Sequence, residues 1–265
     1  METLPKPLTY SSYLRIDELL SLQSPRSDGP EHDETLFIII HQVYELWFKQ
    51  LLHELDALMP ALDDGRTDAA LATFKRMLTI LKTLVAQVDI LETMTPLSFN
   101  AFRARLEASS GFQSAQFRAL EFRLGYKREG VLDQHPQGSR GRLLLEQARS
   151  APALYDHFLR YLATQGCAVP AALLRRDVTT AYEGSTDVQA LLVAIYRGGG
   201  FVAQVCERLL DLDEGLQEWR YRHARMVERT IGVKPGTGGS AGAAYLRGTL
   251  FRPLFPDLWA IRSQL

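Results

Sequence analysis

The sequence predicts an all-α protein in which a single helical-bundle domain spans residues 1–265. Two long stretches, from Asp33 to about Met59 and from about Thr67 to Met94, carry apolar residues at helical spacing. Pro60 and Pro96 follow these stretches, and a proline at such a point ends or kinks a helix. No stretch alternates polar and apolar residues with a sustained period of two, so a sheet is not expected.

Shorter helices are expected over the rest of the chain. They are predicted from Ser98 to about Leu106, from near Gln113 to Leu124, and within LLLEQARS and ALYDHFLRYLATQG. Two further helices are predicted beyond Thr186. They are separated by Gly198, Gly199 and Gly200, and the second ends at Gly232. Residues 126–141 lack periodicity and are interpreted as an exposed connection. The tail, KPGTGGSAGAAYLRG followed by FRPLFPDLW, is rich in glycine and proline and is expected to be irregular.

Composition and charge narrow the class of protein. Of the 265 residues 46% are hydrophobic and 23% are charged, which is typical of a globular protein with a packed core. The formal net charge of -1 provides no overall field to attract nucleic acid or an acidic membrane surface. The start of the chain lacks the features of a secretory signal, and no apolar stretch reaches membrane-spanning length. With two distant cysteines and no CxxC spacing, a cytoplasmic protein is expected.

Two histidines lie among apolar residues on predicted helices. His41 follows Phe37 by one turn, and His223 shares a stripe with Trp219 and Met226. By default such a histidine is a hydrogen-bonded core residue, and the residues alone leave that interpretation open for both. An isolated neutral imidazole is also what a haem iron requires from its axial ligand, and arginines near His223 could meet the haem propionates. Zinc fits less well, because the chain has no HExxH motif.

A binding site for an amphipathic acid is suggested by a second pair of residues. Phe99 and Arg103 lie one helical turn apart, which pairs an aromatic wall with a guanidinium group that can bind a carboxylate through two hydrogen bonds. The alternative is a surface arginine that extends its charge to water. The glycine-rich run from Gly236 to Gly242 lacks the Walker lysine, so a loop that closes over a ligand is favoured over a phosphate loop.

Four segments of the chain resemble the tryptophan 2,3-dioxygenase family. They are, in order, YSSYLRIDELLSLQ, HDETLFIIIHQVYELWFKQLLHEL, LSFNAFRARLEASSGFQSAQFRALEFRLG and WRYRHARMVERTIGVKPGTGGSAG, and the resemblance runs from about Tyr10 to Arg262. It implies a helical subunit around one haem b, assembled as a homotetramer (a dimer of dimers). It also implies cleavage of the indole C2=C3 bond of L-tryptophan by O2 to give N-formylkynurenine, in the kynurenine pathway of tryptophan catabolism.

The resemblance further implies a role for each matching residue. His223 would be the proximal ligand of the haem iron, which would leave the sixth position open for dioxygen. His41 would be the catalytic residue of the distal pocket, hydrogen-bonded to the indole N–H. Phe37, Phe99 and Leu106 would form a wall around the indole, Arg103 would bind the carboxylate and Thr237 would bind the ammonium group. Ser110 and Gly111 would lie beside the haem and the indole.

The resemblance also implies a contact between subunits. Tyr10 and Tyr13 belong to an N-terminal segment (about residues 1–22) that would reach into the neighbouring subunit's pocket.

Two other functions stay open at this point. A relative with the same haem and pocket would insert a single oxygen atom into tryptophan or a substituted tryptophan in secondary metabolism. A non-catalytic helical interaction protein would use the same histidines only as core residues. The dioxygenase is the primary prediction, because a scaffold has no need of His41, Arg103 and His223 together.

Overall fold

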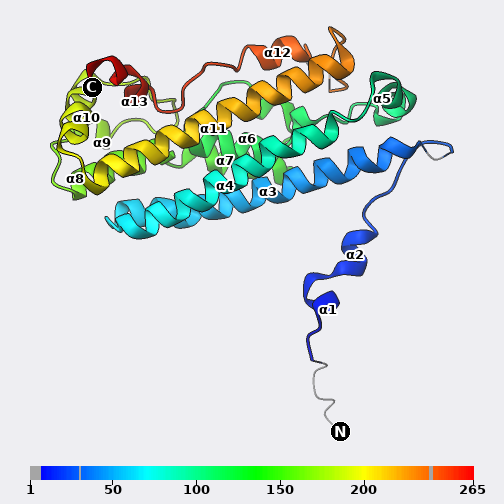
Figure 1. Cartoon of the computed structure of the whole chain (residues 1–265), viewed down its shortest axis with the longest axis horizontal. Helices are drawn as coiled ribbons and strands as arrows, with labels where there is room; N and C mark the ends of the chain where they lie inside the picture. The colour runs from blue at the N-terminus through cyan, green and yellow to red at the C-terminus, as the bar shows by residue number, and fades with distance from the viewer. Residues whose placement is uncertain (1–6, 30, 239–240) are drawn as a thin grey trace.

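Three long helices form the frame of the computed structural model, which describes residues 7–29, 31–238 and 241–265. α3 (His32–Asp63), α4 (Thr67–Leu91) and α11 (Gly200–Ile231) run side by side, and α4 packs against both of the others (Figure 1). The residues described form helices, turns and loops but no strand, which confirms the all-α prediction.

Shorter helices surround this frame. α6 (Ala115–Leu124) and α8 (Leu154–Thr164) pack on α3, and α7 (Arg140–Ser150) packs on α6. The remaining helices are α1 (Tyr10–Leu14), α2 (Ile16–Leu20), α5 (Pro96–Arg103), α9 (Ala171–Leu174), α10 (Thr186–Gly198), α12 (Ala243–Arg247) and α13 (Pro256–Ala260). Short 3-10 turns occupy Ala104–Leu106, Gly111–Gln113, Leu132–Gln134 and Arg262–Gln264.

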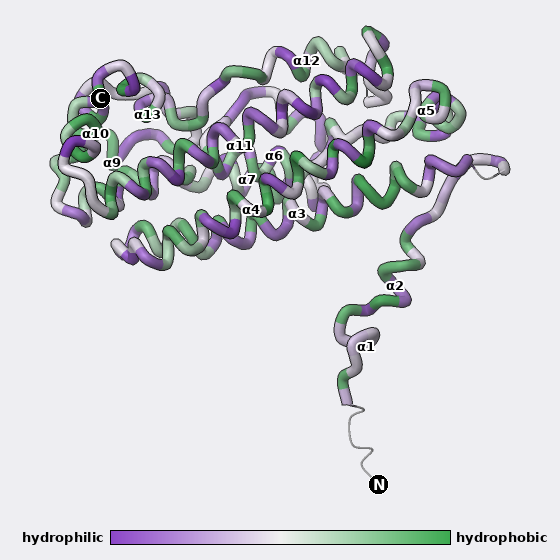
Figure 2. Tube along the Cα trace, viewed as in Figure 1, coloured by the Kyte–Doolittle hydropathy of each residue, from purple (hydrophilic) through white to green (hydrophobic). Residues whose placement is uncertain are grey.

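The long helices are held together by apolar faces. The face of α3 is formed by Leu51, Leu55, Leu58 and Leu62, and that of α4 by Phe74, Met77, Leu81 and Leu84. None of these side chains is more than 4% exposed, and burying one such side chain stabilises the fold by about 1.5–3 kcal/mol. Figure 2 shows hydrophobic residues recurring along both helices, as the helical period requires.

Pro60 does not end α3, contrary to the sequence prediction. The helix continues to Asp63 with Pro60 in its last turn. Proline lacks the N–H that would bond to the carbonyl of Asp56 one turn earlier, and Asp56 is exposed, so water can satisfy that carbonyl. The Pro60 carbonyl still accepts a hydrogen bond from the Asp64 N–H at 2.9 Å. A proline this close to the end of a helix therefore removes one hydrogen bond without stopping the helix.

Pro96 separates two helices as predicted, although both boundaries differ from the expected ones. α4 ends at Leu91, and Pro96 occupies the first position of α5, where a missing N–H has no helical partner to lose. The Thr95 hydroxyl caps this helix by accepting a hydrogen bond from the Ser98 N–H at 3.1 Å. α5 ends at Arg103, and the predicted helix to Leu106 is completed by a 3-10 turn.

A sharp corner joins α10 to α11. The two helices meet at an angle of 119°, and Gly199 and Gly200 at the corner have φ values of 68° and 87°, which glycine adopts more readily than any other residue. Within the described ranges, no single helix is long and apolar enough to cross a membrane, and this bent pair passes that test only when its two halves are combined.

The N-terminal arm, residues 7–22, extends away from the bundle (Figure 1). Its base is fixed on α3, because the Glu34 carboxylate accepts hydrogen bonds from the N–H groups of Arg26 at 2.6 Å and Ser27 at 3.1 Å. Beyond this anchor neither α1 nor α2 has a buried residue, and Tyr10 and Tyr13 are 76% and 72% exposed.

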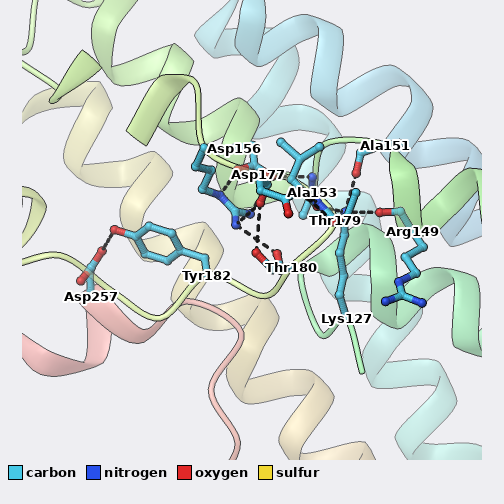
Figure 3. A network of polar contacts seen from close by, with 12 residues as sticks. Lys127, Arg149, Ala151, Ala153, Asp156, Asp177, Thr179, Thr180, Tyr182 and Asp257 are labelled. Carbon is cyan, nitrogen blue, oxygen red and sulfur yellow. Dashed lines mark hydrogen bonds and ion pairs between the residues drawn. The ribbon is translucent and has the colours of Figure 1, made fainter. Parts of the chain in front are cut away.

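A polar network fastens the segment between α7 and α10 to the rest of the bundle (Figure 3). The buried Lys127 ammonium group donates to the carbonyls of Arg149, Ala151 and Val178. Tyr182 donates to the fully buried Asp257 carboxylate at 2.6 Å. Because each donor lies 22 or more residues along the chain from its acceptors, the network ties the loops of this segment to distant parts of the fold.

Candidate active site

A cavity that is partly open to solvent is lined by residues of α3, α5, α6, α11 and α12. Figure 1 shows α5 and α12 at the same end of the bundle. Apolar, aromatic and a few polar side chains line the cavity together, as in pockets that bind small molecules. Nine of the residues singled out in the sequence line it: Phe37, His41, Phe99, Arg103, Leu106, Ser110, Gly111, His223 and Thr237. The fold thus brings together side chains from α3, α5, α11 and two loops.

His223 lines the cavity from α11. Its ring stacks on Trp219, one turn earlier, with centroids 5.1 Å apart and planes 12° from parallel. It makes no hydrogen bond with any residue that the structure describes. Burial, and after it the nearby His41 and Arg118, lower the pKa of His223 to about 4. The imidazole is therefore neutral near pH 7, with a nitrogen lone pair available to a ligand.

His41 faces the same cavity from α3. Its Nδ1 lies 2.6 Å from the Phe37 carbonyl oxygen. A carbonyl can only accept a hydrogen bond, so Nδ1 carries the proton and Nε2 is an acceptor in the neutral ring. Burial lowers the pKa of His41, which favours this neutral form. His41 therefore offers an acceptor to a ligand that carries an N–H or O–H group.

Aromatic rings form one wall of the cavity. Phe37 lies 5.8 Å from Phe99 and 5.5 Å from Phe102, measured between ring centroids, and the Phe99–Phe102 pair is edge-to-face at 5.4 Å. Such contacts fix the rings relative to one another. Leu106 packs against the same cluster. The result is a rigid apolar surface suited to a flat hydrophobic ligand.

Two polar residues at the mouth of the cavity are held by backbone carbonyls far away in the sequence. Arg103 donates to the carbonyl of Pro235 at 2.6 Å, and the Thr237 hydroxyl donates to the carbonyl of Ser109 at 2.5 Å. These bonds fasten the start of the glycine-rich loop to the segment that follows α5. Both side chains line the cavity, so a polar ligand can exchange with the carbonyls.

Glycine is required at one point of this loop by a close approach. A Cβ atom placed on Gly238 would lie 2.6 Å from the Cβ of Ser110, which is closer than two such atoms can come. The predicted loop over a ligand is therefore a loop packed on the Ser110–Gly111 segment. Residues 239 and 240 of the glycine-rich run lie outside the described residues.

A buried cluster of arginines completes the cavity, and sequence reasoning missed most of it. The Glu121 carboxylate accepts hydrogen bonds from Arg118 at 2.5 Å, Arg220 at 2.8 Å and Arg128 at 2.9 Å. Three cations and one anion leave a surplus of two positive charges, and the Nε atom of each arginine is buried without a partner among the described residues. The only signal in the sequence was the set of arginines flanking His223, which includes Arg220.

This cluster faces the cavity and favours an anion there. Arg118, Arg220 and Glu121 all line the cavity and are at most 6% exposed. Uncompensated charge that is removed from water is costly, and a carboxylate or phosphate that pairs with it lowers that cost. The cavity therefore combines an apolar wall, two neutral imidazoles and a desolvated positive surface.

The chemistry of these groups fits an iron porphyrin. The free nitrogen of His223 can bind iron, the apolar walls suit a flat macrocycle, and the arginine cluster suits its two carboxylates. A bare metal ion fits poorly, because the described part of the chain contains no group of three or more histidine, cysteine, aspartate or glutamate side chains that could hold one.

Tyr10 and Tyr13 lie outside the cavity of their own chain, on the exposed arm. No contact between described residues of one subunit brings them to the other predicted site residues. Their placement is compatible with the implied contact to a second subunit, which stays a prediction.

Comparison with known proteins identifies the family. The sequence model described as tryptophan 2,3-dioxygenase matches residues 3–142 and 185–265. Proteins named tryptophan 2,3-dioxygenase are similar along almost their whole length: one from Herpetosiphon aurantiacus is 60% identical over 258 residues (97% of this chain and 98% of the relative), and one from Anaeromyxobacter sp. (strain K) is 61% identical over 258 residues (97% and 96%). One from Caulobacter vibrioides is 43% identical over 261 residues (97% and 98%). The chain belongs to the tryptophan 2,3-dioxygenase family.

Proposed function

We propose that this chain is a haem-dependent enzyme that cleaves the indole C2=C3 bond of L-tryptophan with O2 and yields N-formylkynurenine, with both oxygen atoms retained in the product. The observation that supports this most is that one cavity holds a neutral imidazole without a hydrogen-bond partner in the described chain, an aromatic wall and a guanidinium group. The relatives named above carry the same activity in their names, and the pathway it serves would be tryptophan catabolism.

The inner part of the cavity would hold haem b. His223 would bind the iron from one side, and Arg118 and Arg220 would pair with the propionates, which removes the surplus charge around Glu121. The haem supplies the capacity to bind and activate dioxygen, which no side chain of this protein has. The chain would contribute the shape of the site, the exclusion of water from it and its charge.

The outer part of the cavity would hold the amino acid. Phe37, Phe99 and Leu106 would enclose the indole, since a flat apolar ring fits the rigid wall that they form. Arg103 would exchange the Pro235 carbonyl for the substrate carboxylate, which as an anion is the stronger acceptor.

Two loops would complete the substrate site. Thr237 would turn its hydroxyl from Ser109 towards the ammonium group. Ser110 and Gly111 would lie beside the indole and the haem, in the segment on which the glycine-rich loop packs. Binding of the substrate would therefore hold the loop in place.

His41 would orient the indole. Its Nδ1–H is held by the Phe37 carbonyl, so Nε2 can accept a hydrogen bond from the indole N–H. That hydrogen bond would fix the orientation of the indole ring in the pocket, and with it the position of the C2=C3 bond. It also places a base beside the indole N–H. This N–H becomes more acidic when the C2=C3 bond reacts, because the nitrogen lone pair is then drawn into the ring.

We further propose a homotetramer in which the N-terminal arm completes the pocket of a neighbouring subunit. The arm bears Tyr10, Tyr13 and Leu20, which are 70–76% exposed, and its helices bury nothing in their own chain. Large apolar side chains displayed in this way gain stability when a partner covers them.

Product analysis tests the proposed reaction. Haem-reconstituted, reduced protein is supplied with L-tryptophan and isotope-labelled dioxygen, and the product is examined by mass spectrometry. We expect N-formylkynurenine with two labelled oxygen atoms. A product with one labelled atom would instead identify a monooxygenase, and the absence of turnover in haem-replete protein would overturn the proposal.

A further inference from the structure

Trp219 is held rigidly between the core and the cavity. The side chain is 7% exposed. Phe117 packs against its indole at 4.8 Å, and Phe48 and Tyr44 lie edge-on to it at 6.1 and 6.2 Å, measured between ring centroids. These three rings come from α3 and α6, so the indole is fixed by helices other than its own. Its orientation is therefore set by the fold and not by α11 alone.

The fixed indole presents a flat surface to His223. The two rings are 12° from parallel, with centroids 5.1 Å apart, because residues four apart on a helix lie above one another. The other ring–ring contacts of Trp219 are tilted or edge-on, at 47–90°. The near-parallel stack is thus particular to the histidine.

No described residue gives His223 the hydrogen bond that normally restrains a metal-binding histidine. Such a residue usually donates its second ring N–H to a carboxylate, a carbonyl or water, and this bond fixes the rotation of the ring. His41 shows the arrangement in this cavity, with Nδ1 bonded to the carbonyl one turn earlier. The corresponding carbonyl for His223 belongs to Trp219, and no such bond forms within the described chain.

We infer that Trp219 is the positioning residue for His223: its indole face, and not a hydrogen bond to another described residue, sets the rotation of the imidazole and hence the direction of its free nitrogen. The inference rests on the proposed role of His223 as the haem ligand. An imidazole without an anionic hydrogen-bond partner is also a weaker electron donor, which favours the reduced state of the iron it binds.

Three variants isolate the stacking contact. Trp219→Leu removes the ring face, Trp219→Phe retains a smaller one, and Trp47→Leu makes the same chemical change on α3 outside the cavity. Trp219→Met, which fills more of the space without a ring, replaces Trp219→Leu if the latter does not fold. Circular dichroism establishes that each variant is helical before haem is added.

The measurement is the iron–histidine stretching band in the resonance Raman spectrum of the reduced, haem-loaded protein. We expect a single narrow band in the wild type, Trp219→Phe and Trp47→Leu, and a shifted, broadened or split band in Trp219→Leu. Loss of a stacked pair should also release haem to apomyoglobin about two- to tenfold faster.

The outcomes separate this inference from the proposed function. A wild-type band in Trp219→Leu would overturn the positioning role, and so would a band in Trp219→Phe that is disturbed as strongly as in Trp219→Leu. If the wild-type protein binds no haem, or if its spectrum shows no histidine ligand, the proposed function itself is wrong.

Discussion

The charge of Glu121 should matter more to the stability of this protein without haem than with it. Glu121→Gln keeps the shape of the side chain and one acceptor oxygen but leaves the buried Arg118 and Arg220 and the partly buried Arg128 without this counter-charge. Removing one partner of a buried ion pair costs about 3–5 kcal/mol. Since 1 kcal/mol corresponds to roughly 2–4 °C in Tm for a chain of this size, the apoprotein should melt roughly 6–20 °C lower.

Haem should reduce this loss, because its two carboxylates would restore negative charge beside Arg118 and Arg220. The assay is the free energy of unfolding in urea and the Tm, each measured with and without haem. Glu146→Gln is the matched control: its partner Arg142 lies 2.8 Å away, but Glu146 is 43% exposed, and such surface pairs contribute about 0.3–0.5 kcal/mol. An apoprotein loss in Glu121→Gln as small as in this control would refute the reasoning.

Three further predictions concern the mouth of the cavity and the polar network. Arg103→Leu should raise the KM for L-tryptophan by about 30-fold or more. Turnover of tryptamine, which has no carboxylate, should stay nearly unchanged. Equal effects on both substrates would contradict the assignment of Arg103 to the substrate carboxylate. Gly238→Ala should raise the KM because its Cβ would collide with Ser110, and Ser110→Gly in the same chain should recover part of the loss, which steady-state kinetics of the pair can check. Burial lowers the pKa of Lys127 from 10.5 to about 8, so between these values the unfolded chain binds more protons than the folded one and stability should rise with pH. Urea titrations at pH 8, 9 and 10 should show this rise relative to Lys127→Met; an identical pH dependence in both proteins would exclude the shift.

Local pattern in the sequence was sufficient for the long helices and for one key side chain. It was wrong for the tail, which was expected to be irregular but contains α12 and α13, and for residues 126–141, which were expected to be exposed although Val131 and His135 are buried. The apolar period along α4 predicted a long helix because helix formation and one-sided burial both follow that period. The position of His223 among apolar residues predicted a neutral ring facing inward, and the structure places it in the cavity. The end of α3 was wrong by four residues, because a proline in a last turn removes only one bond.

Contacts between distant segments were decided only by the tertiary structure. Arg103 meets Pro235 across 132 residues, and Thr237 meets Ser109 across 128. No local pattern encodes which loop lies over which helix end, because that choice depends on how the long helices pack. The resemblance to a family named Arg103 and Thr237, but it did not give the carbonyls that hold them.

What the sequence by itself determined is the all-helical class, the apolar faces and the chemical types of residue available for a site. What only the tertiary structure decided is that a single glutamate collects three arginines beside a histidine whose ring is held by stacking. The physical reason is the distance along the sequence between the residues that interact. Helices form from neighbours within one or two turns, whereas burial and charge in a cavity are set by residues that packing alone brings together.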